Sequence, residues 1–271
     1  DEEYGNGVHQ WYCGMQDAGG VLQKGPWVGN RFHWYCLFDN EDYRITKGVK
    51  HRFQYDSQVK NGRGYYYPGT PEYKLMATGK NMDDVKVQEP VAPFNDGLTY
   101  TNSISSNCLA FTTKYADVTD PTIGRTDAYW PFLRYADIVL IYAEAQCELN
   151  DGISQDAIDA LNDIRIRSNA KEASVTGDGA IETKVELRSV IFEERAKELA
   201  YEGDRRWDLL RWGIYLDVMN SLGGINEDGT RTPYDEGSIN KRREFRHLLY
   251  PLPSLEVSTN MAIDKNNPGW N

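Results

Sequence analysis

The sequence predicts a mainly α-helical fold, in which helical hairpins pack with a large loop-rich part that contains short strands. Two observations support this prediction. After Trp130, apolar residues recur at helical spacing between recognisable start and stop signals. Before it, Gly, Asn, Asp and Pro interrupt the chain every few positions. We therefore expect a loop-rich subdomain at residues 1–130 and a helical scaffold at residues 131–271.

The first expected hairpin joins two helices through a short connection. One helix covers residues 132–149 and stops at residues 150–152, Asn-Asp-Gly, a sequence typical of a helix end. Ser154 is placed to cap the next helix. That helix presents apolar side chains at a period of about 3.6 residues, namely Ala157, Leu161 and Ile164.

A second pair of helices is expected further along the chain. Thr183 and Glu186 have the spacing of a capping box, so a helix should begin here and continue to Gly203. Asp204 is expected to cap a shorter helix that reaches Trp212. Helical hairpins in series favour a tetratricopeptide-like arrangement, although the chain shows no internal repeat of about 34 residues.

In the loop-rich subdomain we expect short strands at residues 49–55, where apolar and polar residues alternate, and at residues 109–113. The four cysteines lack the paired spacing of a zinc site. Cys147 lies in a predicted helix and is expected to be a buried thiol. Cys13 and Cys36 lie in loop-rich sequence, which leaves open whether they form a disulfide.

Charge and hydropathy exclude several function classes. The 271 residues carry a formal net charge of −11, which argues against nucleic acid and anionic lipid as partners, because phosphate groups bind basic surfaces. This charge fits neutral or basic ligands. No apolar run reaches the roughly 18 residues that a membrane-spanning helix needs.

The sequence contains no recognisable metal or cofactor motif. Residues 39–42, Asp-Asn-Glu-Asp, lack the glycine and the distal glutamate of an EF-hand loop. We interpret them as a solvated turn and predict no cofactor, with a looser calcium site as the alternative. The four histidines are widely spaced and stand outside any catalytic motif.

The glutamates of the helix that begins after Thr183 are the most clustered titratable residues. Glu194 and Glu198 share one helical face, and a glycoside hydrolase needs such a carboxylate pair beside a cleft. Arginines occur among these acids in similar number, which favours ion pairs that hold helices in register. We therefore predict no catalytic residue. The expected ion-pair network comprises Glu194, Arg195, Glu198, Glu202, Arg205, Arg206 and Asp208.

Tyrosine and tryptophan are concentrated in the first 130 residues. Sugar rings pack their C–H groups on such aromatic faces, while amide, carboxylate and guanidinium groups bond to the hydroxyls. Glycines between positions 11 and 35 fit a platform built from loops. For any single aromatic residue, burial against the helices is the alternative. The residues that we predict to contact a glycan are Trp11, Gln16, Asp17, Trp27, Asn30, Arg31, Trp34, Tyr35 and Tyr66.

Several segments resemble those of a known family in their amino-acid sequences and in their order along the chain. They are Arg134-Tyr-Ala-Asp-Ile-Val-Leu-Ile-Tyr-Ala-Glu-Ala145, Leu161-Asn-Asp-Ile-Arg-Ile-Arg167, Arg206-Trp-Asp-Leu209, Tyr250-Pro-Leu-Pro253 and Asn267-Pro-Gly-Trp270. Together they resemble the C-terminal half of the SusD/RagB family of nutrient-binding outer-membrane lipoproteins. The resemblance covers about residues 109–271, and the aromatic-rich N-terminal part of the chain matches loosely.

The resemblance implies a SusD-like fold and a protein that binds an oligosaccharide or polysaccharide at the cell surface without catalysis. It implies a SusC-like TonB-dependent transporter of the outer membrane as the partner. It also implies that the N-terminal half of the family's domain, which carries the lipid anchor, is missing here and is a further partner. RagB-like peptide capture is the alternative, and a glycoside hydrolase that uses Glu194 and Glu198 is less favoured. The glycan and its linkage stay open.

Overall fold

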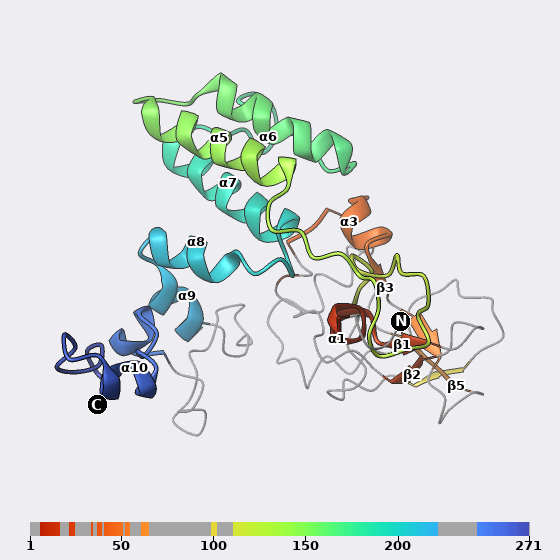
Figure 1. Ribbon diagram of the computed structural model, residues 1–271. Coiled ribbons are helices and arrows are strands. Elements are labelled where there is room, and N and C mark those ends of the chain that lie inside the picture. The colour runs from red at the N-terminus through yellow and green to blue at the C-terminus, as the bar shows by residue number, and fades with distance from the viewer. Residues whose placement is uncertain are drawn as a thin grey trace. The chain divides into compact units, whose positions relative to one another are not determined.

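The computed structural model describes residues 6–16, 22–24, 34, 37–39, 41–50, 52–54, 61–64, 99–101, 111–221 and 243–270 (Figure 1). Within these ranges the chain forms two compact units, which divide between Glu202 and Gly203. The subdomain boundary predicted at residue 130 follows a change in local composition, and it stays a prediction.

Three helices pack together in the first unit: α5 (Tyr135–Leu149), α6 (Gln155–Arg167) and α7 (Lys184–Glu198) (Figure 1). Their shared core is apolar and excludes water. Its fully buried members include Leu140, Ala143, Cys147, Ala157, Leu161, Leu187 and Ile191. The predictions of a mainly α-helical fold and of a buried Cys147 thiol are therefore confirmed.

The start signals that the sequence predicts for α6 and α7 are both present. The hydroxyl of Ser154 accepts the backbone N–H of Ala157 at 3.3 Å. Thr183 and Glu186 form a reciprocal capping box. The Thr183 hydroxyl accepts the backbone N–H of Glu186, and the Glu186 carboxylate accepts the backbone N–H of Thr183.

Two predicted helix limits are wrong. Helix α5 begins at Tyr135 rather than at residue 132, because Arg134 has an extended backbone with φ of −122° and ψ of 154°. Helix α7 ends at Glu198 rather than at Gly203. The chain leaves the helix because Tyr201 adopts a left-handed conformation with φ of 69°, which no α-helix accommodates.

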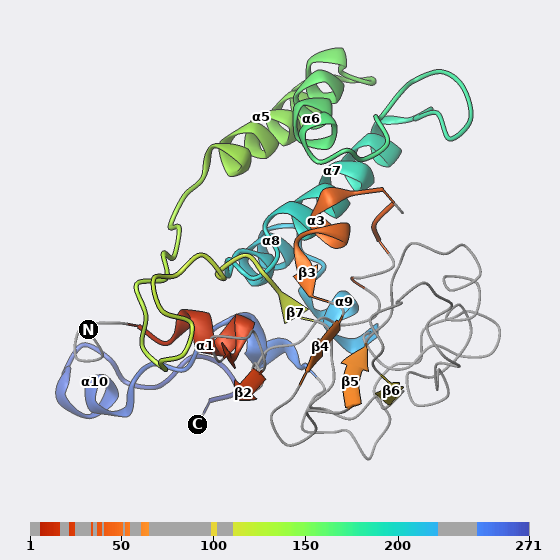
Figure 2. The same cartoon turned by 90° about the vertical axis from the view of Figure 1, so that its right-hand side faces the viewer.

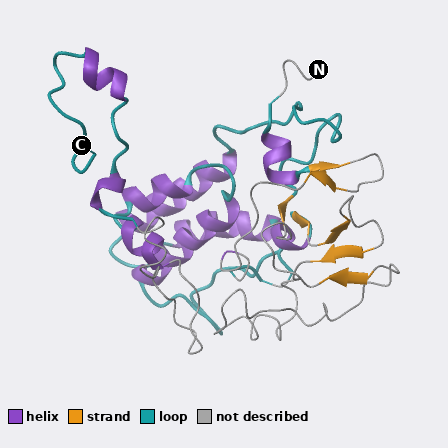
Figure 3. Ribbon diagram, turned by 90° about the horizontal axis from the view of Figure 1, so that it is seen from below, coloured by secondary structure: helices purple, strands orange, loops and turns teal. Residues whose placement is uncertain are grey.

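Outside these three helices, the described residues of the first unit form short helices and strands (Figures 2 and 3). They are α1 (Val8–Cys13), β1 (Met15–Gln16), β2 (Leu22–Lys24), α3 (Tyr43–Thr46), β3 (Val49–Lys50), β4 (Arg52–Gln54), β5 (Asn61–Gly64), β6 (Thr99–Thr101) and β7 (Phe111–Thr112). Strands β1 and β2, β3 and β7, and β4 and β5 pair antiparallel, whereas β5 and β6 pair parallel. Strands β3, β4 and β7 fall where the sequence predicts strands.

A second apolar cluster surrounds α1. Val8 and Cys13 of this helix pack around Tyr115. The Tyr115 ring stacks on Trp130 with the ring centroids 5.4 Å apart, and its hydroxyl donates to the carbonyl of Tyr201 at 2.8 Å. Tyr115 and Trp130 therefore stabilise the fold. For aromatic residues of the first 130 positions, such burial is the alternative to contact with a ligand.

Cys13 is a free thiol, so it forms no disulfide with Cys36, which itself lies outside the described residues. The Cys13 side chain is completely buried and donates to the carbonyl of Thr112 at 3.2 Å. Burial raises the pKa of this thiol to about 11. Because the thiolate is the reactive form, Cys13 is expected to be inert at neutral pH.

The second unit contains α8 (Arg205–Arg211), α9 (Tyr215–Ser221), the 3₁₀ helix η3 (Phe245–Leu248) and α10 (Ser254–Thr259). Asp204 precedes α8 as predicted, but its side chain makes no capping hydrogen bond. The guanidinium of Arg206 lies 4.8 Å from the ring centroid of Tyr215 and 4.4 Å from that of Tyr250. Cation–π contacts thus connect α8, α9 and the segment after η3. Among the residues that the structure describes, no helix is long and apolar enough to cross a membrane.

Candidate functional site

Three carboxylates lie at the end of α7. Glu194 and Glu198 are one turn apart on the same face, and Glu202 follows after the chain has left the helix. Their exposed fractions are 0%, 5% and 9%. Buried ionised carboxylates require cationic partners. The positions of those partners define the site.

Glu194 binds arginines from two distant segments. It accepts a hydrogen bond from Nη1 of Arg44 at 2.6 Å and another from Nε of Arg165 at 2.8 Å. Arg44 also pairs with Asp42 at 2.7 Å, and Asp42 accepts the backbone N–H of Arg44 at the start of α3. Asp42 therefore serves an ion pair and a helix cap. No metal-binding group of three His, Cys, Asp or Glu side chains occurs among the described residues.

Glu198 is shared by three arginines. Its carboxylate lies 2.7 Å from Nη2 of Arg167, 3.1 Å from Nη2 of Arg134 and 3.2 Å from Nη1 of Arg44. These arginines come from the end of α6, the start of α5 and α3. One buried side chain of α7 therefore connects three segments that are far apart in sequence.

Glu202 completes the arrangement. Arg134 donates to both carboxylate oxygens of Glu202, through Nε and Nη2, each at 2.7 Å. The ammonium of Lys114 pairs with the same carboxylate and donates to the carbonyl of Ala200 at 2.9 Å. Bidentate pairing fixes the orientation of both partners.

The glutamates form ion pairs, as predicted, but not within the predicted network. Their partners are Arg44, Lys114, Arg134, Arg165 and Arg167, none of which belongs to it. Arg44, Lys114 and Arg167 come from other segments, and the sequence gives no local sign that they approach α7. The one available signal was indirect: three glutamates on the buried side of one helix require several cations. Arg195, a member of the predicted network, pairs with Asp137 of α5 at 2.8 Å.

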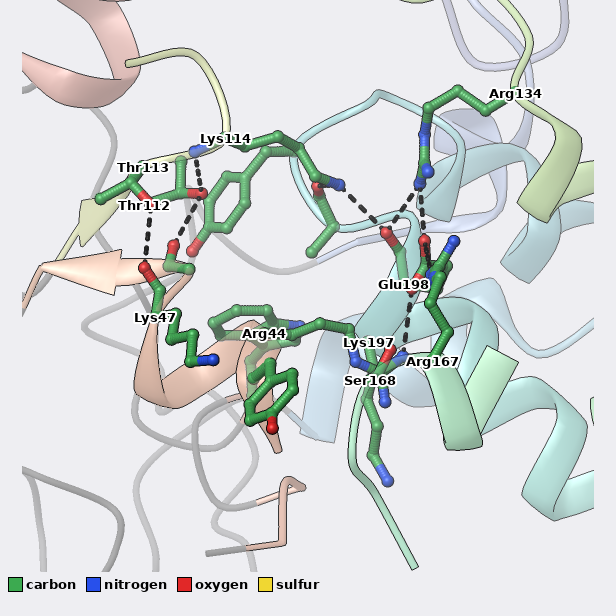
Figure 4. Close-up of a pocket in the computed structure, with 15 residues that line it drawn as sticks. Arg44, Lys47, Thr112, Thr113, Lys114, Arg134, Arg167, Ser168, Lys197 and Glu198 are labelled. Carbon is green, nitrogen blue, oxygen red and sulfur yellow. Dashed lines mark hydrogen bonds and ion pairs between the residues drawn. The ribbon is translucent and has the colours of Figure 1, made fainter. Parts of the chain in front are cut away.

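A pocket of about 420 Å³ opens beside these ion pairs (Figure 4). Its wall contains six cationic side chains, three aromatic rings and one carboxylate among the described residues. The lining residues are Trp34, Tyr43, Arg44, Lys47, Gly48, Thr112, Thr113, Lys114, Arg134, Arg167, Ser168, Lys197, Glu198, Ala200 and Tyr201. All belong to the first unit.

The aromatic part of the wall is held in place by its own contacts. The indole N–H of Trp34 donates to the carbonyl of Ala196 at 2.8 Å, and the Trp34 ring meets Tyr201 edge-on at 5.5 Å. Tyr43 is 43% exposed, and the ammonium of Lys47 lies 3.5 Å from its ring centroid. The wall thus offers flat apolar surface next to hydrogen-bond donors.

Opposite charges stabilise one another beside the pocket. Burial opposes ionisation of Glu198, but Arg167, Arg44 and Arg134 outweigh it and hold the pKa of this carboxyl below its ordinary value. Burial lowers the pKa of Lys114, and the nearby charge of Arg134 adds to this effect, although Glu202 opposes both.

The lowered pKa of Glu198 predicts acid sensitivity. As the pH falls below about 5, the unfolded chain takes up a proton at this residue before the folded protein does. The free energy of unfolding should therefore decrease as the pH falls through the folded-state pKa, and Glu198→Gln should show a smaller decrease. Urea unfolding at pH 7 and at pH 3 measures both. Glu172→Gln, at an exposed carboxyl, is the control and should decline as the wild type does. An identical decline in Glu198→Gln would contradict the assignment.

The structure brings one of the predicted glycan contacts to this pocket. Trp34 lines it, whereas Trp11 of α1, 45% exposed, and Gln16 of β1 do not. The others lie outside the described residues: Asp17, Trp27, Asn30, Arg31, Tyr35 and Tyr66. Whether any of these residues contacts a glycan stays a prediction.

The geometry of Glu194 and Glu198 fits a structural role. A glycosidase general acid needs a raised pKa so that it carries a proton at neutral pH. The pKa of Glu198 is instead lowered, and both carboxylates are occupied by arginines. These are the contacts of ion pairs that hold helices in register.

Comparison with known proteins identifies proteins of similar sequence. "SusD-like protein P2" of Formosa agariphila is 33% identical over 142 residues, which cover 51% of this chain and 25% of the relative. "SusD-like protein P38" of the same organism is 36% identical over 142 residues, covering 50% and 25%. The matched part is thus a quarter of the length of these relatives.

Solved structures agree on the fold. The crystal structure of a SusD superfamily protein from Parabacteroides distasonis has a TM-score of 0.54 at 20% identity, over 97% of this chain and 46% of that one. At this identity the likeness shows the fold alone, and it supports the SusD-like helical architecture. The family model described as "SusD family" matches residues 29–270, nearly the whole chain. The chain therefore belongs to the SusD family.

Proposed function

We propose that this protein is a non-catalytic glycan-binding component of an outer-membrane uptake system. It captures an oligosaccharide or polysaccharide at the cell surface, where a lipid anchors it, and delivers the ligand to a SusC-like TonB-dependent transporter. Membership of the SusD family supports a nutrient-binding role. The observation that carries the proposal is the pocket beside α7, which combines aromatic surface with polar donors.

The chemistry of the pocket suits a sugar. The exposed part of Tyr43 and the ring of Trp34 offer apolar surface for the C–H groups of a pyranose. The exposed cations Lys47 and Arg167 present N–H donors beside this surface for hydroxyl oxygens. A volume of about 420 Å³ lies in the range of small-ligand sites. Affinity should be modest, because an open pocket buries only part of a long ligand.

Removal of the exposed ring tests the proposal. Tyr43→Ala is expected to weaken binding of the retained glycan about tenfold, since a stacked aromatic contact contributes roughly 1 kcal/mol or slightly more. The matched control is Tyr129→Ala, which removes a 79% exposed ring outside the pocket and should leave affinity unchanged. Affinity gel electrophoresis of the full-length protein on a polysaccharide panel measures both variants, and circular dichroism checks their folding.

Each outcome decides between functions. Retardation by a glycan, lost in part in Tyr43→Ala alone, supports capture at this pocket. Equal retardation of both variants would place the glycan elsewhere. A protein that no polysaccharide retards, but that enriches members of a mixed peptide digest, would be a peptide-capturing relative. Release of reducing ends in the same tubes would overturn the non-catalytic assignment.

A further inference from the structure

The mouth of the pocket has positive charge that the surrounding carboxylates do not match. Glu198 is the one carboxylate among the described lining residues, and three arginines share it. Arg44 and Arg134 have further partners in the buried Glu194 and Glu202. Arg167 shares its carboxylate with both of them, so its own charge is only partly compensated.

Lys47 adds a second cation at the opening. Its side chain is exposed, and within the described part of the chain its ammonium contacts the Tyr43 ring rather than a carboxylate. Arg167 is likewise 52% exposed. The two residues lie on opposite sides of the pocket in Figure 4, Lys47 after α3 and Arg167 at the end of α6. Both keep N–H groups available to a ligand.

The net charge of −11 makes this local excess informative. A general negative charge repels anions at long range, and it favours neutral or basic ligands. Salt screens that repulsion beyond about 8 Å at physiological ionic strength. At contact distance the nearby guanidinium and ammonium groups therefore determine whether an anion binds. Hydrogen bonds between such groups and an anion are roughly twice as strong as neutral ones.

We propose that the pocket binds an acidic glycan, whose sugar rings pack on Tyr43 and Trp34 while its anionic groups contact the exposed cations Lys47 and Arg167 on the two sides of the pocket. This inference rests on the proposed glycan-binding function and narrows it to one ligand chemistry. Each anionic group is a carboxylate or a sulfate ester, because both offer several acceptor oxygens to guanidinium and ammonium donors.

Pairs of polysaccharides that share a sugar chain but differ in charge distinguish recognition of the anionic group from recognition of the sugar chain. Polygalacturonate is compared with its fully methyl-esterified form, and κ-carrageenan with its desulfated form. The acidic member of one pair should bind at least about tenfold more tightly than its neutral counterpart, and added NaCl should reduce this difference. Preference within the first pair identifies a carboxylate, and preference within the second identifies a sulfate ester.

Variants assign the preference to the pocket. In Lys47→Gln/Arg167→Gln the acidic glycan should lose about tenfold in affinity, while the neutral form changes less than twofold. Lys47→Gln alone tests the exposed residue without touching the buried pairs. The control is Lys184→Gln, at a cation outside the pocket that pairs with Glu148. It should bind as the wild type does.

The negative outcomes are distinguishable. Neutral and acidic forms that bind equally, or a double variant that keeps the preference, would overturn the acidic-glycan inference and leave glycan capture standing. A protein that binds neither member of either pair, nor any other polysaccharide, would overturn the proposed function together with this inference.

Discussion

Glu194→Gln is expected to lower the free energy of unfolding by about 3–5 kcal/mol, the cost of breaking a buried ion pair at one partner. Glu194 is completely buried and accepts hydrogen bonds from Arg44 and Arg165. Glutamine has nearly the same volume, so the substitution removes the charge without opening a cavity. Both guanidinium groups then lie beside a neutral amide in a region that water enters poorly.

Urea unfolding monitored by circular dichroism measures this loss. Glu148→Gln is the matched control, because Glu148 also binds an arginine, Arg188 at 2.7 Å, but is 45% exposed. An exposed pair contributes about 0–1 kcal/mol, so the control should change little. Equal effects of the two substitutions would show that the pairs of Glu194 contribute no more than surface contacts do.

Leu140→Ala is expected to lower the free energy of unfolding by about 2–5 kcal/mol, through lost burial and the cavity that remains. Leu140 is completely buried where α5 meets α6 and α7, and close-packed neighbours collapse only partly into the vacated space. The same unfolding measurement applies.

Leu149→Ala is the control for this substitution. Leu149 lies on the same helix but is 79% exposed, so its removal should change the free energy of unfolding by less than about 0.5 kcal/mol. If Leu140→Ala were as mild as Leu149→Ala, the contact between α5 and its neighbours would be loose, and the helices would pack less specifically than their burial indicates.

The helices were predictable because their signals are local. Ser154 and the pair Thr183 and Glu186 set helix starts through contacts within one turn, and the sequence shows these residues directly. The end of α7 was not predictable in the same way. It depends on the left-handed backbone of Tyr201, whose hydrogen bond with Tyr115 forms only in the folded protein.

The site residues also differ in whether local sequence could identify them. Trp34 was identified by its chemistry, and the structure places it in the pocket. Arg44 was not, because it reaches Glu194 across 150 positions of sequence. A single cation in a loop-rich segment looks like any solvated residue until tertiary structure places it against a buried acid. Local patterns therefore predicted the acidic half of the site and missed the basic half.

The double duty of the arginines limits how this pocket can diverge. Arg44 and Arg134 both line the pocket and hold buried carboxylates, so a mutation there alters recognition and folding together. Tyr43 and Lys47 are exposed, and their side chains contact each other rather than the buried acids. New ligand preferences are therefore most accessible to evolution at positions 43 and 47, while selection for a folded chain preserves the arginines.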